Sequence, residues 1–182
     1  MPWIPAHAAY AKGFRCIYPK FASEFLRKIP EEYRLHLSRC FVIIDNDHLV
    51  AYITLRADSL TVRDEKGRKK KVSTPDGDFL NPPAVKISLL AADVRATGAG
   101  KRLVDWSLKF IAETISPNIG ARFVKVDAYY DHNAKDEHGR SKPYDSSLFY
   151  LKLGFQYVDP NETLPPRDAF RSMFFDLKPL ID

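Results

Sequence analysis

A glycine-rich turn is the stretch of this chain best suited to bind a ligand. It reads Arg95-Ala-Thr-Gly-Ala-Gly-Lys-Arg102 and leads directly into an apolar helical segment. Glycines two positions apart let the backbone turn tightly and approach a ligand closely. A helix that begins here leaves its first amide groups without partners, and Lys101 and Arg102 add positive charge. The stretch therefore predicts an anion site, above all one for a phosphate group.

The spacing of these residues narrows the class of phosphate ligand. A P-loop requires a glycine where Arg95 stands and a magnesium-binding hydroxyl where Arg102 stands. A dinucleotide fingerprint requires a third glycine at the position of Leu103. Both nucleotide classes are therefore disfavoured, and a P-loop-like nucleotide binder is kept only as the weakest alternative. What remains is the pattern Arg-x-x-Gly-x-Gly.

Composition limits the class of protein that carries this turn. At 182 residues, with 45% apolar and 13% aromatic residues, the chain is long enough for one domain with a sizeable core. The net charge of +5 favours anionic partners. Cys16 and Cys40 form no Cys-x-x-Cys pair, so free thiols are expected rather than a disulfide scaffold or a thiolate zinc site. No secretory signal or membrane-length apolar run is recognised, which predicts a cytoplasmic protein without membrane contact.

Hydrophobic periodicity predicts the elements that precede the turn. Apolar residues at helical spacing indicate a helix over 20–29, and Pro30 is expected to open a second short helix that ends near Ser38. Strands are predicted over 41–44 and 49–60 with a turn at 45–47, followed by a long polar hairpin connection over 63–83. The alternation over 85–92 ends wholly apolar, which is typical of a strand that enters a sheet centre.

The elements after the turn complete an α+β pattern. The helix that follows the turn is expected to stop at Pro117. A short helix is predicted over 145–153, with Asp145 as N-cap and Gly154 as C-terminal cap. Further strands are predicted over 123–130, 155–158 and 170–177, and a polar loop over 131–143. Strand–helix–strand units require parallel crossovers, so a mixed sheet with helices on both faces follows.

Three stretches, taken in order, resemble the GNAT superfamily of N-acetyltransferases. The first is the strand Val85-Lys-Ile-Ser-Leu-Leu-Ala-Ala-Asp93, and the second runs from Arg95 to Val104. The third, Ser147-Leu-Phe-Tyr-Leu-Lys-Leu-Gly-Phe155, resembles a late helix of that family, in which a Phe-Tyr pair precedes a Gly-Phe. The resemblance implies one GNAT-like domain over residues 1–182. Its fold would be three-layer α+β, with a mixed, mostly antiparallel central sheet that contains a parallel splayed pair.

The resemblance also implies a reaction and a set of site residues. Acetyl-CoA would be the cosubstrate, no metal would be needed, and a primary amine would attack the thioester directly. Tyr150 would protonate the departing thiolate as a general acid. The backbone amides of Leu90 and Ala92 would bind the pantetheine arm and the thioester oxygen. The pyrophosphate would be held by the amides of Gly98, Ala99, Gly100 and Lys101, with the side chains of Arg95 and Lys101 as further candidates.

The amine-activating base is not identified by this resemblance. Four residues at or beyond the end of the strand over 123–130 are candidates: Asp127, Tyr129, Asp131 and His132. The loop before the late helix is longer than in the family, and Pro143 replaces a frequent asparagine, so Asn133 would serve only if an insertion follows it. The acidic and histidine residues over 131–138 match no zinc or calcium spacing, so a solvated loop is expected.

The basic segment Lys66-Gly-Arg-Lys-Lys-Lys71 leaves the acceptor open. It is either a solvated hairpin tip or a contact for nucleic acid phosphates. The chain also resembles the GNAT toxins of toxin–antitoxin pairs, which acetylate the amino acid of a charged tRNA. The acceptor is therefore a small amine, a protein amine or a charged tRNA, and an antitoxin and a second copy of the chain are candidate partners. The competing hypothesis is a non-catalytic module that senses acyl-CoA or binds RNA.

Overall fold

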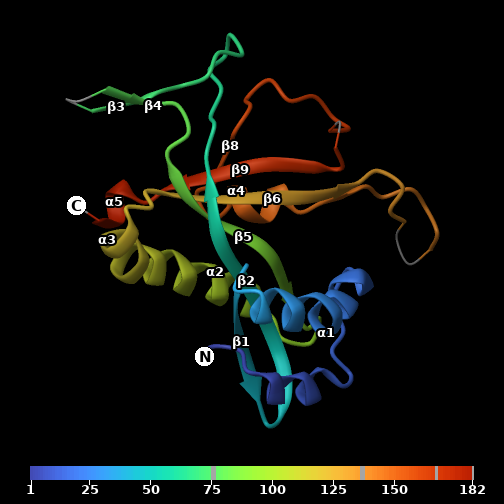
Figure 1. The fold of residues 1–182 in the computed structure, drawn as a ribbon. Coiled ribbons are helices and arrows are strands. Elements are labelled where there is room, and N and C mark those ends of the chain that lie inside the picture. Colours follow the sequence, from blue (N-terminus) through green and yellow to red (C-terminus); the bar gives the residue numbers. More distant parts are fainter. Residues whose placement is uncertain (75–76, 136–137, 167, 182) are drawn as a thin grey trace. The chain divides into compact units, whose positions relative to one another are not determined.

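The computed structural model describes residues 1–74, 77–135, 138–166 and 168–181 (Figure 1). The chain forms two compact units. Unit 1 comprises Met1–Ala57 and Lys86–Thr114, and unit 2 comprises Asp58–Val85 and Ile115–Asp182. Each unit has a buried hydrophobic cluster of its own. The single domain predicted over residues 1–182 stays a prediction.

An antiparallel hairpin begins the sheet of unit 1. β1 (Arg39–Asp45) pairs with β2 (His48–Ser59). Asn46 and Asp47 connect them with φ angles of 46° and 60°, the left-handed conformation that a two-residue type I′ turn requires. The turn predicted at 45–47 is therefore confirmed. On its other side β2 pairs with β5 (Pro83–Ala92), the strand that leads into the glycine-rich turn.

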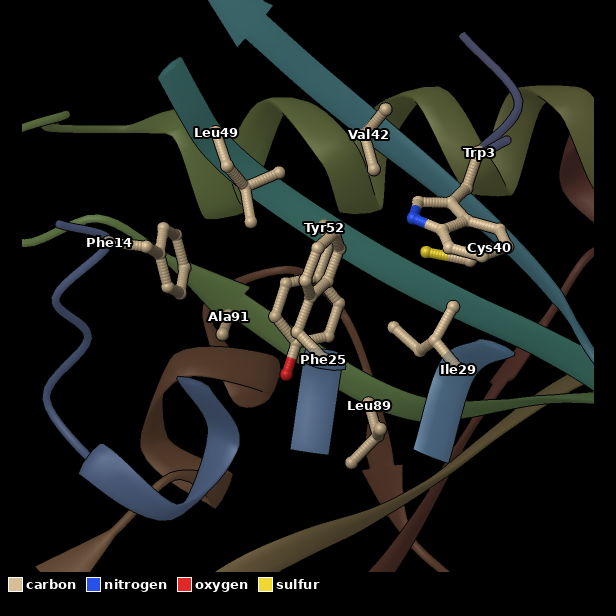
Figure 2. Packing of buried hydrophobic residues seen from close by; sticks show 10 residues of the cluster. All are labelled: Trp3, Phe14, Phe25, Ile29, Cys40, Val42, Leu49, Tyr52, Leu89 and Ala91. Carbon is tan, nitrogen blue, oxygen red and sulfur yellow. The ribbon is translucent and has the colours of Figure 1, made fainter. Parts of the chain in front are cut away.

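One face of this sheet is covered by α1 (Pro19–Arg34), as Figure 2 shows for the cluster between them. The ring of Tyr52 on β2 packs against that of Phe25 on α1, with centroids 4.9 Å apart. The Tyr52 hydroxyl donates to the carbonyl oxygen of Phe21. Leu89 and Ala91 bring β5 into the same cluster. Burial of such apolar side chains, at about 1.5–3 kcal/mol each, holds the helix on the sheet.

The other face is covered by α2 (Ala99–Phe110). Successive residues of a strand point to opposite sides, so Phe41 faces away from the cluster that contains its neighbours Cys40 and Val42. Phe41 of β1 packs against Trp106 and Phe110, with ring centroids 4.8 and 5.4 Å away. The rings of Trp106 and Phe110 are stacked on each other at 5.1 Å. Unit 1 by itself thus has a helix, a sheet and a helix in three layers.

Pro30 lies inside α1, so the predicted break between two helices is wrong. The helix runs for 16 residues from Pro19 to Arg34. An internal proline removes one hydrogen bond and costs about 3 kcal/mol. The helix nevertheless continues because Phe25 and Ile29 are buried in the core of unit 1, and their burial contributes about 1.5–3 kcal/mol each.

The helical segment that starts with α2 also continues past its predicted stop. A π-helical turn, η2 (Ile111–Ile115), leads into α3 (Ser116–Ile119), and Pro117 lies in the first turn of α3. Proline is tolerated there because its missing N–H would have no intrahelical acceptor. The segment ends instead at Gly120, whose φ of 73° is a left-handed C-cap. The predicted end at Pro117 is therefore wrong.

An antiparallel pair of strands forms the centre of unit 2. β6 (Phe123–Asp131) pairs with β9 (Phe170–Asp176) along seven residues of each strand. β8 (Gln156–Tyr157) adds to the other side of β9, and β7 (Tyr144–Asp145) pairs with the end of β6. The strands predicted over 123–130, 155–158 and 170–177 are confirmed, and β8 is shorter than predicted.

A single helical turn, α4 (Ser147–Leu151), follows β7. The sequence predicted a longer helix with Asp145 as its N-cap, and this start is wrong because Asp145 belongs to β7. The Asp145 carboxylate still accepts a hydrogen bond from the first helical amide, that of Ser147, at 2.9 Å. The predicted C-terminal cap is confirmed, since Gly154 has a φ of 86°.

The long connection predicted over 63–83 is confirmed and carries a small sheet of its own. β3 (Val72–Thr74) pairs with β4 (Gly77–Phe79). Short helical segments, η1 (Pro5–Ala11) and α5 (Lys178–Ile181), complete the described elements. Both cysteines are free thiols, as predicted. Within the described ranges, no helix combines the length and the apolar character needed to cross a membrane.

Candidate functional site

Asp93 organises the glycine-rich loop from a buried position directly after β5 (5% exposed). Its Oδ1 accepts hydrogen bonds from the backbone N–H and the Nε of Arg95, at 2.9 and 2.7 Å. Its Oδ2 accepts from Nη2 of Arg95 at 2.7 Å and from the backbone N–H of Arg15 at 3.0 Å. The Arg95 guanidinium also donates to the carbonyl oxygen of Gly13 at 3.0 Å. The carboxylate thus ties the loop to the segment that precedes α1.

The role of Asp93 was not predicted from the sequence. The spacing Asp-x-Arg was the available signal, but a carboxylate beside an arginine also fits a solvated loop. Only the fold brings Arg15, which lies 78 residues earlier, to the same carboxylate. The Arg95 guanidinium holds the pKa of Asp93 well below its usual range, because ionisation strengthens every one of these hydrogen bonds.

Asp93→Asn is expected to destabilise the chain in a pH-dependent way. At pH 7 the free energy of unfolding falls by about 1–3 kcal/mol, because donors of Arg95 and Arg15 lose a charged acceptor. The pKa of Asp93 is lower in the folded chain than in the unfolded chain, where it is about 3.9. Its ionised carboxylate therefore stabilises the fold fully above about pH 3.9, and this stabilisation decreases as the pH falls below that value toward the folded-state pKa. Urea unfolding of the parent and of Asp93→Asn at pH 7 and pH 3 tests this prediction. A difference in their free energies of unfolding that is the same at both pH values would contradict it.

The start of α2 presents backbone amides that the helix itself does not use. Gly98 is the N-cap, with a φ of 79° that glycine adopts without strain. The amide of Ala99 donates to the carbonyl of Ala96 at 3.1 Å, and that of Arg102 to the carbonyl of Gly98 at 3.0 Å. The amides of Gly100 and Lys101 lie between them at positions without an intrahelical acceptor, and no side chain caps the helix. Adjacent donors at the positive end of a helix suit an anion.

Two cationic side chains of this loop, those of Arg95 and Lys101, are engaged with neighbouring carboxylates. Arg95 is bound to Asp93, and Nζ of Lys101 is paired with Asp105 one helical turn later. Among the predicted pyrophosphate ligands, the amides of Gly100 and Lys101 have no intrahelical acceptor, whereas the Ala99 amide donates to the carbonyl of Ala96 within the loop. The binding roles of Arg95, Gly98, Ala99, Gly100 and Lys101 stay predictions.

The last residues of β5 direct alternate amides to opposite sides of the strand. The Leu89 amide donates to Oγ1 of Thr54 at 2.9 Å, and the Asp93 amide donates to the carbonyl of Val50 at 2.8 Å, both on β2. The amides of Leu90 and Ala92 therefore point away from β2. A side-chain hydroxyl in place of a carbonyl marks an irregular ladder at Leu89. The structure thus gives the direction of both predicted amides relative to β2, and their binding role stays a prediction.

Tyr150 is buried on α4 in unit 2, with 6% of its surface exposed. Its ring lies between those of Phe149 and Phe155, with centroids 5.1 and 5.4 Å away in edge-on contacts. Burial raises the pKa of Tyr150, so its hydroxyl stays protonated at physiological pH.

The four candidate bases occupy the end of β6 and the residue after it. The Asp127 carboxylate accepts a hydrogen bond from the Ser172 hydroxyl at 2.7 Å. The Asp131 carboxylate accepts from the backbone amide of Asn133 at 2.9 Å, which is an Asx-type turn. Tyr129 packs against Phe170 at 5.7 Å, and His132 is exposed. The contacts of these four residues do not distinguish one of them as the base, which stays unassigned.

Metal-ligating side chains do not gather anywhere in the part of the chain that the structure describes, where no group of three or more His, Cys, Asp or Glu residues is placed to hold an ion. The acidic residues 136–137, which belong to the polar loop considered for a metal, lie outside the described residues.

Comparison with known proteins places the fold. No protein-family model matches the chain, and no curated protein matches its sequence. A mutant of KacT superimposes with a TM-score of 0.67 at 20% identity, over 99% of this chain and 95% of that one. AtaT complexed with acetyl-methionyl-tRNAfMet does so with a TM-score of 0.66 at 17% identity, over 93% and 89% of the two chains. The chain has the GNAT fold.

The GNAT fold confirms the predicted α+β class, with a mixed sheet that contains a parallel pair. A further structure holds an AtaT mutant toxin with the C-terminus of the antitoxin AtaR and acetyl-CoA. It superimposes with a TM-score of 0.61 at 17% identity, over 93% of this chain and 86% of that one. In this structure and in the KacT mutant, one tyrosine has been replaced by phenylalanine.

Proposed function

We propose that this chain is an acetyl-CoA-dependent N-acetyltransferase that modifies the amino group of a charged tRNA, as the toxin of a toxin–antitoxin pair. The observation that carries the proposal is the match to the AtaT complex with acetyl-methionyl-tRNAfMet over nearly the full length of both chains. The matched structures that contain acetyl-CoA and an antitoxin segment support the cosubstrate and the partner. The proposed location is the cytoplasm, where charged tRNA is found.

Acetyl-CoA binding is assigned to unit 1 in this proposal. The amides of Gly98, Gly100 and Lys101 would receive the pyrophosphate at the positive end of α2. The amides of Leu90 and Ala92, which point away from β2, would bind the pantetheine arm and the thioester oxygen. Backbone donors suit this task because they are held by the strand and the helix, and no reorganisation is needed when charge develops on the oxygen.

The proposed chemistry uses Tyr150 as the general acid. The amine nitrogen attacks the thioester carbonyl, the carbon–sulfur bond breaks, and the departing thiolate takes the phenolic proton. The tyrosinate then regains the proton that the new amide nitrogen loses, so that overall a proton passes from the amine to the thiol. An α-amino group has a pKa near 8, so a sizeable neutral fraction exists at pH 7 without a dedicated base.

A thiol-release assay tests this function. The parent chain is incubated with acetyl-CoA and, in turn, charged tRNA, uncharged tRNA, a lysine-containing peptide and small amines. The expected result is rapid CoA release that requires charged tRNA, with N-acetylated amino acid recovered after hydrolysis of the ester. Binding of acetyl-CoA without release on any acceptor would instead identify an acyl-CoA sensor. Binding of ATP without binding of acetyl-CoA would support the P-loop-like reading.

The basic hairpin tip provides a substrate-specific prediction. Asp64 closes the tip by accepting hydrogen bonds from the backbone amides of Lys66 and Arg68, at 2.9 and 2.8 Å. Lys66, Lys69 and Lys70 are exposed, and within the described residues no carboxylate pairs with them. Replacing all three by alanine is expected to raise KM for charged tRNA and to reduce its salt dependence by about one unit of slope per lost phosphate contact.

The control for this prediction removes the same charge elsewhere. A variant with alanine at Lys20, Arg27 and Lys109, which are exposed on the helices of unit 1, should leave KM for charged tRNA unchanged. Neither variant should alter turnover with a small amine. Equal effects of the two triple variants on charged tRNA would show that only net charge matters and that the hairpin tip is a solvated turn.

A further inference from the structure

A buried arginine on β9 holds the start of α4. Arg171 has a side-chain exposure of 10%, and its Nη1 donates to Oδ2 of Asp145 at 3.0 Å and to Oγ of Ser147 at 3.1 Å. Its Nε donates to Oε2 of Glu162 at 3.4 Å. The guanidinium carbon lies 4.0 Å from the centre of the Tyr157 ring. One side chain therefore joins β7, α4, β8 and the segment that follows β8.

Both carboxylates around Arg171 are needed to keep a charge in this environment. A buried cation is stable only when it is paired and its donors are satisfied. Burial raises the pKa of Glu162, whereas the Arg171 guanidinium opposes that rise. The Ser147 hydroxyl closes the cluster through a 3.0 Å hydrogen bond with the Tyr157 hydroxyl. The arrangement is thus a connected polar network rather than an isolated ion pair.

α4 depends on this network because it is too short to be stable alone. It has five residues, and a single helical turn without tertiary contacts does not persist in water. Ser147 and Tyr150 are three positions apart and both buried, whereas Leu148 and Leu151 are exposed. Residues at this spacing lie on the same side of a helix. Arg171 therefore binds α4, through Ser147, on the side of the helix that carries Tyr150. This contact lies at the end of α4 opposite to the Gly154 cap.

We propose that Arg171 is the positioning residue for Tyr150, and that it acts by fixing the first residue of α4 through Ser147 and Asp145. The proposal rests on the proposed function, in which Tyr150 delivers a proton to the departing thiolate. Arg171 does not touch the substrate in this scheme. The contacts of its guanidinium group with Asp145 and Ser147 set the position and the tilt of α4. They thereby set the position of the Tyr150 phenol, three residues after Ser147.

Arg171→Lys tests the proposal because it keeps the positive charge and removes the planar guanidinium group with its separate nitrogen donors. The three donors of lysine share one nitrogen, which cannot take the places of both Nη1, at Asp145 and Ser147, and Nε, at Glu162. An ammonium group also cannot stack flat on the Tyr157 ring. The turnover number is expected to fall about tenfold, within the range that a small misplacement of a reacting group costs, while KM for acetyl-CoA stays unchanged. In a Tyr150→Phe background the same substitution should leave the residual turnover unchanged, because the group that it positions is absent. An equal fall in both backgrounds would overturn the proposal.

Two further variants guard against a general loss of folding. Ser147→Ala removes only the contacts of one hydroxyl and is expected to lower turnover in the same direction by a smaller factor. Arg122→Lys is the matched control, since Arg122 binds Asp176 through Nε and Nη2 at 2.9 and 2.6 Å and also lies over an aromatic ring, that of Phe123. It should leave turnover unchanged. A fall in turnover equal to that of Arg171→Lys would assign the effect to loss of an ion pair in unit 2.

Amide hydrogen exchange measures the same positioning without any activity. The Phe155 amide donates to the carbonyl of Tyr150 at 3.1 Å, so its exchange rate reports the order of α4. Exchange of this amide should be faster in Arg171→Lys than in the parent and in Arg122→Lys. Faster exchange in a chain that acetylates no acceptor would support the positioning role and refute the proposed function. An unchanged exchange rate would overturn the positioning role whatever the activity.

Discussion

Replacing Tyr150 by phenylalanine is expected to lower the turnover number of acetyl transfer about 100-fold, the lower end of what a positioned general acid contributes. The Kd of acetyl-CoA should stay nearly the same, because the missing hydroxyl acts only when the carbon–sulfur bond breaks. Steady-state kinetics with charged tRNA and calorimetry with acetyl-CoA measure the two quantities. The ring keeps its edge-on contacts with Phe149 and Phe155, so the fold is preserved.

A second buried tyrosine serves as the control. The hydroxyl of Tyr52 is bonded to the carbonyl oxygen of Phe21 in the core of unit 1, and no catalytic role is assigned to it. Tyr52→Phe should therefore lower the free energy of unfolding by about 1 kcal/mol and leave turnover unchanged. Tyr150→Phe should show the opposite pattern. Unchanged turnover of Tyr150→Phe with several acceptors would remove Tyr150 from the chemistry.

The pH dependence of turnover provides a further check on Tyr150. Burial raises the pKa of its phenol above the ordinary value, so the acid form persists through and beyond neutral pH. Turnover should rise as the pH increases through the amine pKa, near 8, and should not fall again from ionisation of Tyr150 below about pH 10. A descending limb with a midpoint well below 10 that is lost in Tyr150→Phe would show that the phenol is not held in the protonated form.

Gly100→Asp is expected to weaken acetyl-CoA binding about 100-fold, a loss near 2.7 kcal/mol. The new carboxylate would lie at the second position of α2, where it would compete with the pyrophosphate for the amides of Gly100 and Lys101 and repel its charge. The same carboxylate should stabilise the helix itself by about 0.3–1 kcal/mol, because acidic residues are favourable in the first helical turn. Affinity and stability therefore move in opposite directions, which no misfolding effect would produce. Calorimetry and thermal unfolding measure the two changes.

Gly100→Asn is the matched control for this prediction. Asparagine has nearly the shape of aspartate without its charge, so it should keep most of the affinity for acetyl-CoA. The deficit of the aspartate variant should also shrink as salt is raised, since screening weakens the repulsion between charges. Equal weakening by Asp and Asn would point to a steric clash, and an unchanged Kd for Gly100→Asp would place the pyrophosphate away from this helix start.

Periodic and local signals predicted most elements of the fold. The strand over 123–130, the turn at 45–47 and the Gly154 cap depend on residues close together in the chain, and all are confirmed. The two proline predictions failed for different reasons, since Pro117 lies in the first turn of α3, whereas Pro30 lies inside α1. A proline carries a fixed local cost, whereas the apolar contacts that offset it come from other elements, as for Pro30 beside the buried Ile29.

The sequence by itself was enough to predict a phosphate-binding turn, because glycine spacing, a helix start and positive charge act within a few residues of one another. It also placed Tyr150 in a Phe-Tyr…Gly-Phe helix whose cap is confirmed. Only the tertiary structure decided which charged side chains are already bound to partners within the protein. Arg95 is bound to Asp93 and Gly13, and Arg171 gathers Asp145, Ser147 and Glu162 from separate segments. The reason is that the partner of a buried charge is selected by the whole fold, which must satisfy every donor it removes from water.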